Sequence, residues 1–194
     1  MLVLWAVPHI VTGATRGHSP SGHLTFECVS SGNGGGAKVY LWETKRPQTR
    51  RVIYETDVLF VHDVKISPDE NWIAVEWGGG SAGHDIALLK KRDTLDYEEL
   101  DKGDQSLVDE VADLALKSSN HSDLDVDHAY LRPVRWFSDS RTLLLRLGAY
   151  GSGSKSSVEI RNWRCSYNVE TGKLSLLANN PGRVKVTTRV PEKE

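Results

Sequence analysis

Residues 64–78 read VKISPDENWIAVEWG, and residues 134–148 read VRWFSDSRTLLLRLG. The two segments lie 70 positions apart, and apolar residues align with apolar residues and glycine with glycine. Each contains a short turn, because serine and aspartate side chains in both segments can bond neighbouring backbone amides, and in the first segment Pro68 also fixes φ. The β-branched, aromatic or leucine-rich run that follows suits a pleated strand. The spacing predicts one strand-turn-strand unit that is used twice.

A weaker third copy begins with HSPSGH at residues 18–23 and continues through alternating apolar residues to the glycine-rich stretch 32–36. Each copy is followed by another strand-like run. We expect these strands at residues 37–44, 85–91 and 158–169, with further strands at 50–54 and 173–177. Short runs separated by turn residues are typical of an antiparallel meander. The sequence predicts a single β-rich domain over residues 18–190, with repeat units near 18–57, 64–100 and 134–178.

One segment breaks this rhythm of strands. Residues 106–117 read SLVDEVADLALK, in which Leu107, Val111 and Leu114 have the i, i+4, i+7 spacing of one helix face. Ser106 with Asp109 fits a capping box at the start of a helix. The sequence therefore predicts one helical insertion, near residues 106–117, between the second and third units.

The turn segments resemble a known repeat. SPDENWIA at residues 67–74 and, more loosely, FSDSRTLL at residues 137–144 are similar to the turn that precedes an inner strand in TolB-type β-propeller repeats. The resemblance implies propeller blades that serve mainly as scaffolds for binding proteins or ligands, and many such propellers are exported from bacteria. A ring usually needs at least about four blades, and this chain has room for two good units and one weak one. We expect a mainly β fold of propeller-like units, arranged as a twisted sheet or sandwich and not as a closed propeller.

Composition places the chain among ordinary globular proteins. It has 194 residues, 39% hydrophobic residues and a net charge of -2. These values give no reason to expect a nucleic-acid partner. The apolar run within residues 1–17 is too short to cross a bilayer, which takes about 20 residues, so we expect no stable membrane insertion.

The beginning of the chain and the cysteines bear on location. Residues 1–17 fit either a degenerate export signal, without its positively charged start, or a plain first strand. The only two cysteines, Cys28 and Cys165, could form one disulfide in an oxidising compartment. We expect a periplasmic or secreted protein with this bridge, the alternative being a cytoplasmic one.

Charge is segregated along the chain. Residues 93–127 contain twelve acidic residues and two lysines, a net charge of -10, so the remainder carries +8. Such a separation can steer a basic partner during association. We expect the acidic residues Asp96, Glu98 and Glu99 to take part in binding. The oligomeric state is left open.

The loop after the first good repeat is the other candidate site. Trp77 is five positions after Trp72, so the two side chains would project from opposite faces of a strand. Gly78, Gly79 and Gly80 follow Trp77, and His84 comes further on. Tryptophan is enriched at binding hot spots. Glycine loops hold anions where a helix begins after them, but here a strand follows, which indicates a connection between strands. We expect Trp77 and this loop to contact a partner.

No catalytic or metal-binding signature is present in the sequence. The acidic stretch around Asp125 lacks the glycine and glutamate positions of a calcium loop, and no cofactor motif occurs. We expect a non-enzymatic protein-binding domain, and in a more specific version an exported inhibitor or immunity-type protein. The alternatives are a purely structural periplasmic domain and a hydrolase with a cleft that uses His84, Asp85 or the pair Asp127 and His128.

Overall fold

The computed structural model describes residues 11–31, 36–57, 60–79, 83–101, 106–152 and 156–188. Gly80 and most of the expected signal or first strand, residues 1–10, lie outside these ranges. Within them the chain is mainly β, with one helix and three antiparallel meanders that follow one another in the sequence.

Each meander contains four strands that pair in chain order. The first is a separate sheet of β1 (Val11–His18), β2 (Leu24–Ser31), β3 (Ala37–Glu43) and β4 (Arg46–Thr56). The second consists of β5 (Phe60–Ile66), β6 (Trp72–Gly78), β7 (His84–Asp93) and β8 (Asp96–Glu99). The third consists of β9 (His128–Trp136), β10 (Thr142–Ser152), β11 (Ser156–Asn168) and β12 (Lys173–Leu176). A final strand, β13 (Arg183–Thr188), pairs with the first half of β11.

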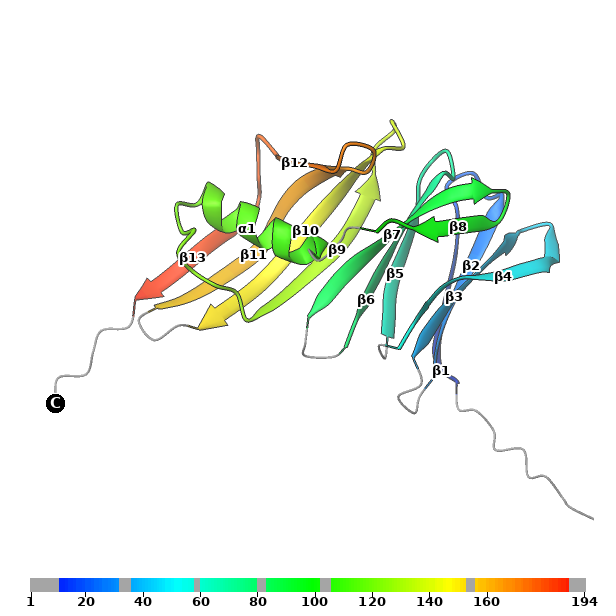
Figure 1. Cartoon of the computed structure of the whole chain (residues 1–194), viewed down its shortest axis with the longest axis horizontal. Coiled ribbons are helices and arrows are strands. Elements are labelled where there is room, and N and C mark those ends of the chain that lie inside the picture. Colours follow the sequence, from blue (N-terminus) through cyan, green and yellow to red (C-terminus); the bar gives the residue numbers. More distant parts are fainter. Residues whose placement is uncertain are drawn as a thin grey trace, which may run out of the picture.

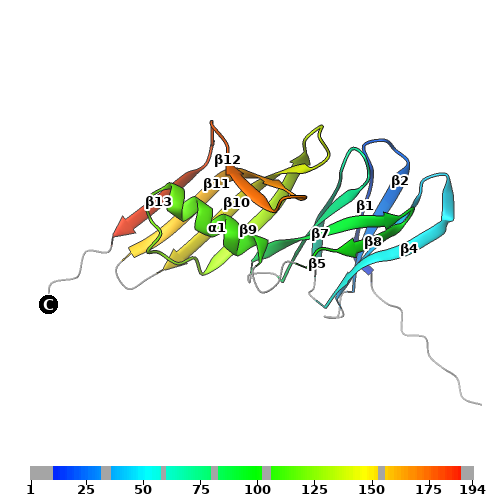
Figure 2. The ribbon, with the colours of Figure 1, turned by 45° about the horizontal axis from the view of Figure 1, so that its top comes forward.

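The meanders lie side by side in chain order (Figure 1, Figure 2). The second and third are joined into one sheet of nine strands through a single parallel pairing of His84 in β7 with Tyr130 in β9. Among the described strands, none of the first sheet pairs with any of the second, so the sheets do not close on each other. The predicted fold class, propeller-like antiparallel units with one helix and no closed ring, is confirmed.

The three turns that carry the repeat have the same backbone. In each, the N–H of the first residue donates to the carbonyl five residues later, at 2.8–2.9 Å. The fourth residue of each turn has a left-handed φ: Gly22 at 75°, Glu70 at 60° and Ser140 at 58°. Glycine adopts this conformation at low cost, whereas glutamate and serine do not. The second and third turns therefore keep the left-handed backbone of the first turn, although Glu70 and Ser140 replace its glycine.

Two apolar cores hold the meanders together. One lies between the first and second meanders and includes Leu41, Ile73 and Val75, which are fully buried. The other lies between the second and third meanders and the helix, and includes Leu131 and Leu145. Because side chains alternate along a strand, β6 supplies odd-numbered residues to the first core and even-numbered residues to the second.

The helix α1 (Leu107–Ser118) confirms the helical insertion expected near residues 106–117. It lies over the third meander (Figure 1) and buries Leu107 and Val111 in the second core. The Ser106 side chain accepts a hydrogen bond from the backbone N–H of Asp109, as the capping box predicted. No helix in the described ranges is both long and apolar enough to span a bilayer.

The predicted disulfide between Cys28 and Cys165 is wrong. Both thiols are free and buried. Cys28 belongs to the first core and Cys165 to the second, so the packing that buries each cysteine also separates them. Burial raises the pKa of each thiol to about 12, which keeps both protonated and unreactive at neutral pH.

Candidate functional site

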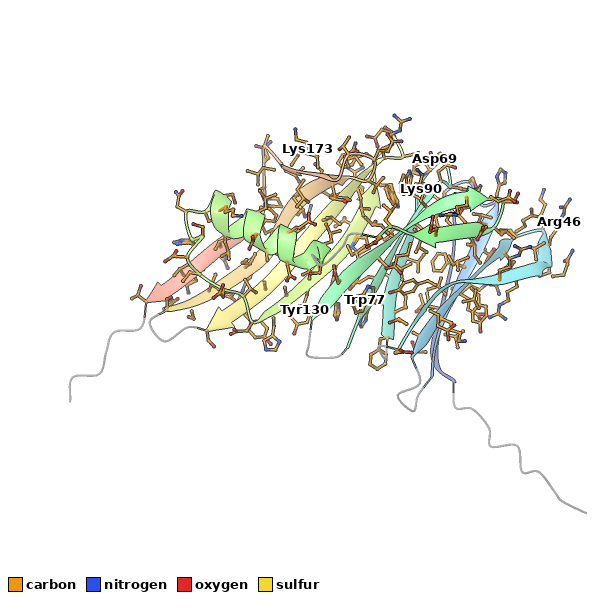
Figure 3. All side chains as sticks on the ribbon, in the orientation of Figure 1. Arg46, Asp69, Trp77, Lys90, Tyr130 and Lys173 are labelled. Carbon is orange, nitrogen blue, oxygen red and sulfur yellow. The ribbon has the colours of Figure 1, made fainter. Side chains whose placement is uncertain are left out.

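Trp77 lies near the end of β6, and its ring is half-buried against the first core. It is at the end of the strand away from the Asp69 turn, on the same side as Tyr130 (Figure 3). Gly78 follows it in a crowded place, where a Cβ would lie 2.5 Å from the carbonyl oxygen of Gly83. Glycine at 78 therefore lets the end of β6 approach the start of β7 closely.

The acidic residues of β8 divide between two faces. Tyr97 is buried and donates from its hydroxyl to the carbonyl of Glu70 at 2.7 Å. Glu99 lies on the same face of the strand as Tyr97. Asp96 and Glu98 project from the other face into solvent, and Glu98 is paired with Arg92. The structure thus separates Glu99 from the two acids that the sequence grouped with it.

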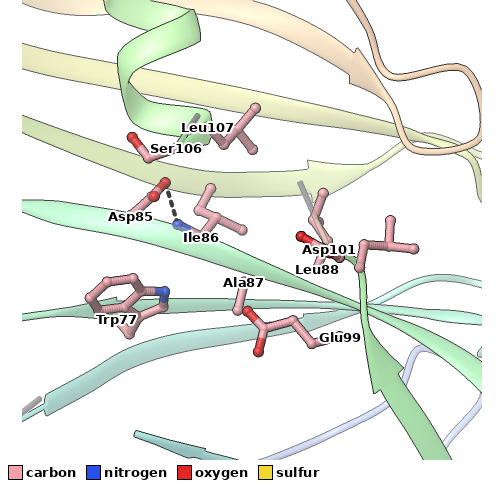
Figure 4. A pocket seen from close by; sticks show the side chains of 10 residues that line it. Trp77, Asp85, Ile86, Ala87, Leu88, Glu99, Asp101, Ser106 and Leu107 are labelled. Atoms are coloured by element: carbon pink, nitrogen blue, oxygen red, sulfur yellow. Dashed lines mark hydrogen bonds between the residues drawn. The ribbon is translucent and has the colours of Figure 1, made fainter. Parts of the chain in front are cut away.

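Trp77 and Glu99 meet at a pocket of about 380 Å³, which we call the acidic pocket (Figure 4). Asp85 and Asp101 add two further carboxylates to its lining. Its apolar lining comes from side chains that are nearly or fully buried, Ile86, Ala87, Leu88 and Leu107. The pocket forms where β8 has left β7 and α1 begins, since β8 pairs with β7 only from Leu89 onward.

The Asp85 carboxylate of the acidic pocket is fixed by backbone hydrogen bonds, and its charge acts on Glu99. Asp85 Oδ1 accepts hydrogen bonds from the backbone N–H of Ile86 at 2.8 Å and of Val108 at 3.1 Å. The second bond places this carboxylate at the beginning of α1, where negative charge is favoured. Burial, and then the nearby charge of Asp85, raises the pKa of Glu99. A cation in the pocket would relieve this repulsion.

His84 does not reach the acidic pocket but forms a buried pair with Glu76. Its Nδ1 lies 2.9 Å from Glu76 Oε1, and both side chains are almost completely buried. His62 stacks on the His84 ring with centroids 3.9 Å apart, and Arg132 Nε lies 3.5 Å from the same Glu76 oxygen. Burial, and then the charge of Arg132, lowers the pKa of His84. We infer a neutral imidazole that donates its Nδ1 proton to Glu76.

Asp127 and His128 have separate surroundings. Asp127 Oδ2 accepts hydrogen bonds from the backbone N–H and the hydroxyl of Ser152, at 2.7 and 3.2 Å. The His128 ring stacks on Tyr150 with centroids 4.7 Å apart. These contacts fix the junction between the start of β9 and the end of β10.

Sequence reasoning did not connect Asp85 and Asp101 with Trp77, and it did not single out Glu76 or Arg132. One signal was available for Glu76, which is the single charged residue in the apolar run 72–78. A charge in a strand that is otherwise apolar on both faces needs a partner. Finding that partner required the tertiary structure.

The comparisons with known proteins give only distant likenesses. No family model matches the sequence, and no curated protein matches it. Among solved structures, the β-propeller domain of the trilobed protease from Pyrococcus furiosus is similar at 16% identity and a TM-score of 0.46, over 93% of this chain and 50% of that one. The acylaminoacyl peptidase of Pyrococcus horikoshii is similar at 11% identity and a TM-score of 0.44, over 89% and 27%. The chain thus spans half the length of the first structure and about a quarter of the length of the second.

Proposed function

We propose that this chain is a protein-binding domain that takes a lysine or arginine side chain of its partner into the acidic pocket. The observation that carries the proposal is the combination of three carboxylates, from Asp85, Glu99 and Asp101, with the Trp77 ring around one opening. A long basic side chain matches both features, because its stem can lie on apolar surface while its charge meets carboxylates. An aromatic wall adds a cation–π contribution.

The contacts of the alternative catalytic residues support binding rather than hydrolysis. A hydrolase needs a nucleophile beside a base that a third group orients. His84 is oriented by Glu76, but in the described part of the chain no serine, threonine or cysteine side chain hydrogen-bonds to it. Asp85 Oδ1 accepts hydrogen bonds from two backbone N–H groups, and Asp127 Oδ2 accepts from the backbone N–H and the hydroxyl of Ser152. The proposed role is therefore non-catalytic.

Short blocked peptides that differ only in their central residue test this function. Peptides with arginine, lysine or glutamine at the centre are titrated while the indole N–H resonance of Trp77 is followed by NMR, after assignment with a Trp77→Phe variant. We expect the basic peptides to shift this resonance and the glutamine peptide not to. Binding should weaken as salt is added, because partly exposed charges are screened.

Charge-neutral variants locate the binding site. Glu99→Gln should weaken the basic peptides about fivefold to tenfold, the range expected for losing one charge-assisted contact at a partly exposed site. Glu98→Gln is the matched control, since it removes the adjacent carboxylate on the opposite face of β8. Equal losses in the two variants, or equal binding of the arginine and glutamine peptides, would contradict the proposed function.

A further inference from the structure

Three arginines lie in one row across the third meander. In the strand register, Arg146 of β10 is directly opposite Arg132 of β9 on one side and directly opposite Arg164 of β11 on the other. Directly opposed residues project from the same face of a sheet and approach within a few ångströms at Cβ. Like charges in such positions destabilise the sheet. This row therefore opposes folding unless something of opposite charge occupies the face.

The row belongs to the face that α1 does not cover. The neighbours of the arginines along each strand, Leu131, Leu145 and Cys165, are fully buried in the core beneath α1. Because side chains alternate along a strand, the arginines project from the opposite face. The basic pocket, of about 400 Å³, opens there, and the row lines it together with His62, Asp63 and Lys65 of β5 and Glu76 of β6.

Carboxylates of the chain neutralise only part of this charge. Arg132 lies beside Glu76, and Lys65 Nζ is 2.8 Å from Asp63. In the described part of the chain, neither Arg146 nor Arg164 has a carboxylate oxygen within 4.0 Å of its guanidinium. Arg164 Nε is moreover buried, and no acceptor in the described residues reaches it. A buried donor of this kind is costly when it is left unsatisfied.

We propose that the arginine row binds a small dianionic oxyanion, either inorganic phosphate or the phosphate group of a small monoester. Two guanidiniums without carboxylate partners match an anion of two charges. Planar guanidinium groups also match the oxygens of a phosphate, often with two hydrogen bonds from one arginine. The third arginine is held by Glu76 at the rim of the pocket, where it adds a donor without adding net charge. The pocket is large enough for an organic group beyond the phosphate.

Thermal unfolding with and without phosphate at constant ionic strength tests the proposal. Inorganic phosphate and glycerol phosphate are compared with acetate at pH 7.5, where a phosphate monoester is mostly a dianion. At a ligand concentration of about ten times Kd, binding to the folded state shifts the unfolding equilibrium about elevenfold. We expect the midpoint temperature to rise by about 3–6 °C. Acetate at the same ionic strength should give no such rise.

Substitutions distinguish a binding role from a structural one. Arg146→Gln and Arg164→Gln should each abolish the phosphate shift, and without phosphate Arg146→Gln should unfold at the same or a higher temperature than the natural chain because repulsion is removed. Arg161→Gln is the matched control, since Arg161 is exposed on β11 and paired with Glu159 away from the pocket. It should retain the full shift.

The relative effects of the two phosphates identify the ligand. A larger shift with inorganic phosphate assigns free phosphate, and a larger shift with glycerol phosphate assigns a monoester. The proposal is overturned if neither anion raises the midpoint above acetate, or if the shift persists in both arginine variants. This site does not share residues with the acidic pocket, so failure of one proposal leaves the other standing.

Discussion

The buried side chains of His84 and Glu76, with the neighbouring His62, make stability depend on pH. Burial lowers the pKa of His84 and, with His84 and Arg132 nearby, that of His62, below the usual value of 6.5. The unfolded chain then binds protons at a pH where the folded chain does not. Stability is therefore present above pH 6.5 and is lost as pH falls through the folded pKa values. Glu76 acts in the opposite sense, because burial raises its pKa above 4.5.

We predict that His84→Gln flattens the rise of unfolding free energy as the pH increases toward 6.5. The reason is that the variant removes one of the groups that the unfolded chain protonates first. Urea unfolding at a series of pH values, at constant ionic strength, measures this slope. Glu76→Gln is the informative companion, since removing the group of opposite sign should steepen the slope. A steeper slope in His84→Gln would show that the imidazole is charged in the folded protein.

Residues of the two proposed sites were less visible in the sequence than those of the repeat. The offset of 70 residues that aligns the two good copies places Glu76 on Arg146, and both line the basic pocket. The sequence alignment thus shows an acidic residue in one copy of the repeat and a basic residue at the equivalent position of the other copy. It could not place Arg132 and Arg164 beside Arg146, because bulges shift the register on both sides of β10. A shift of one residue moves a side chain to the other face of the sheet.

At the scale of elements, α1 was predictable because its signals are local. The apolar stripe and the capping residue lie within one short segment, and the structure uses both. The position of β8 relative to the acidic pocket depends instead on where along β7 its pairing with β8 ends, which is at Leu89. Trp77 could therefore be singled out from the sequence, whereas its meeting with Glu99, Asp85 and Asp101 depended on tertiary packing.

We predict that Ser106→Ala destabilises the protein by about 1 kcal/mol, the usual cost of losing an N-cap side chain. Ser106 Oγ accepts from the N–H of Asp109 and donates to the Asp109 carboxylate at 2.6 Å. For a chain of this length the midpoint temperature should fall by about 2–4 °C. Ser118→Ala is the control, because that hydroxyl donates to the Ala115 carbonyl at the other end of α1 and does not cap the N-terminus of the helix. Equal losses in the two variants would mean that the cap contributes nothing specific.

At the scale of the molecule, the repeat turns join neighbouring meanders. Ser21 of the first turn donates to the Glu70 side chain in the second, and Ser140 Oγ in the third accepts from the backbone N–H of Asp69 at 3.1 Å. Copies of one turn thus serve both as strand connections and as contacts between units. The exported location and the inhibitor role stay predictions, since residues 1–10 lie outside the described ranges and no partner is defined.

Trp136 forms a side-chain link between the second and third meanders. Its indole Nε1 donates to the carbonyl of Lys65 in β5 at 2.8 Å, across 71 positions of sequence. Trp136→Phe keeps an aromatic ring in the core but removes the donor, which we expect to cost about 1–3 kcal/mol. Trp72→Phe is the control, since Trp72 is buried in the same core and, among the described residues, its indole makes no hydrogen bond.

The decisive measurement is whether the two meanders still unfold together. Unfolding is followed by far-UV circular dichroism, which reports on strands, and by tryptophan fluorescence, which reports on side-chain packing. Coincident transitions indicate one cooperative unit. We expect them to coincide in Trp72→Phe and to separate, or to shift to markedly lower denaturant, in Trp136→Phe. If both variants lose the same stability and keep one transition, the link from Trp136 to β5 is not what couples the meanders, and the shared core alone must do so.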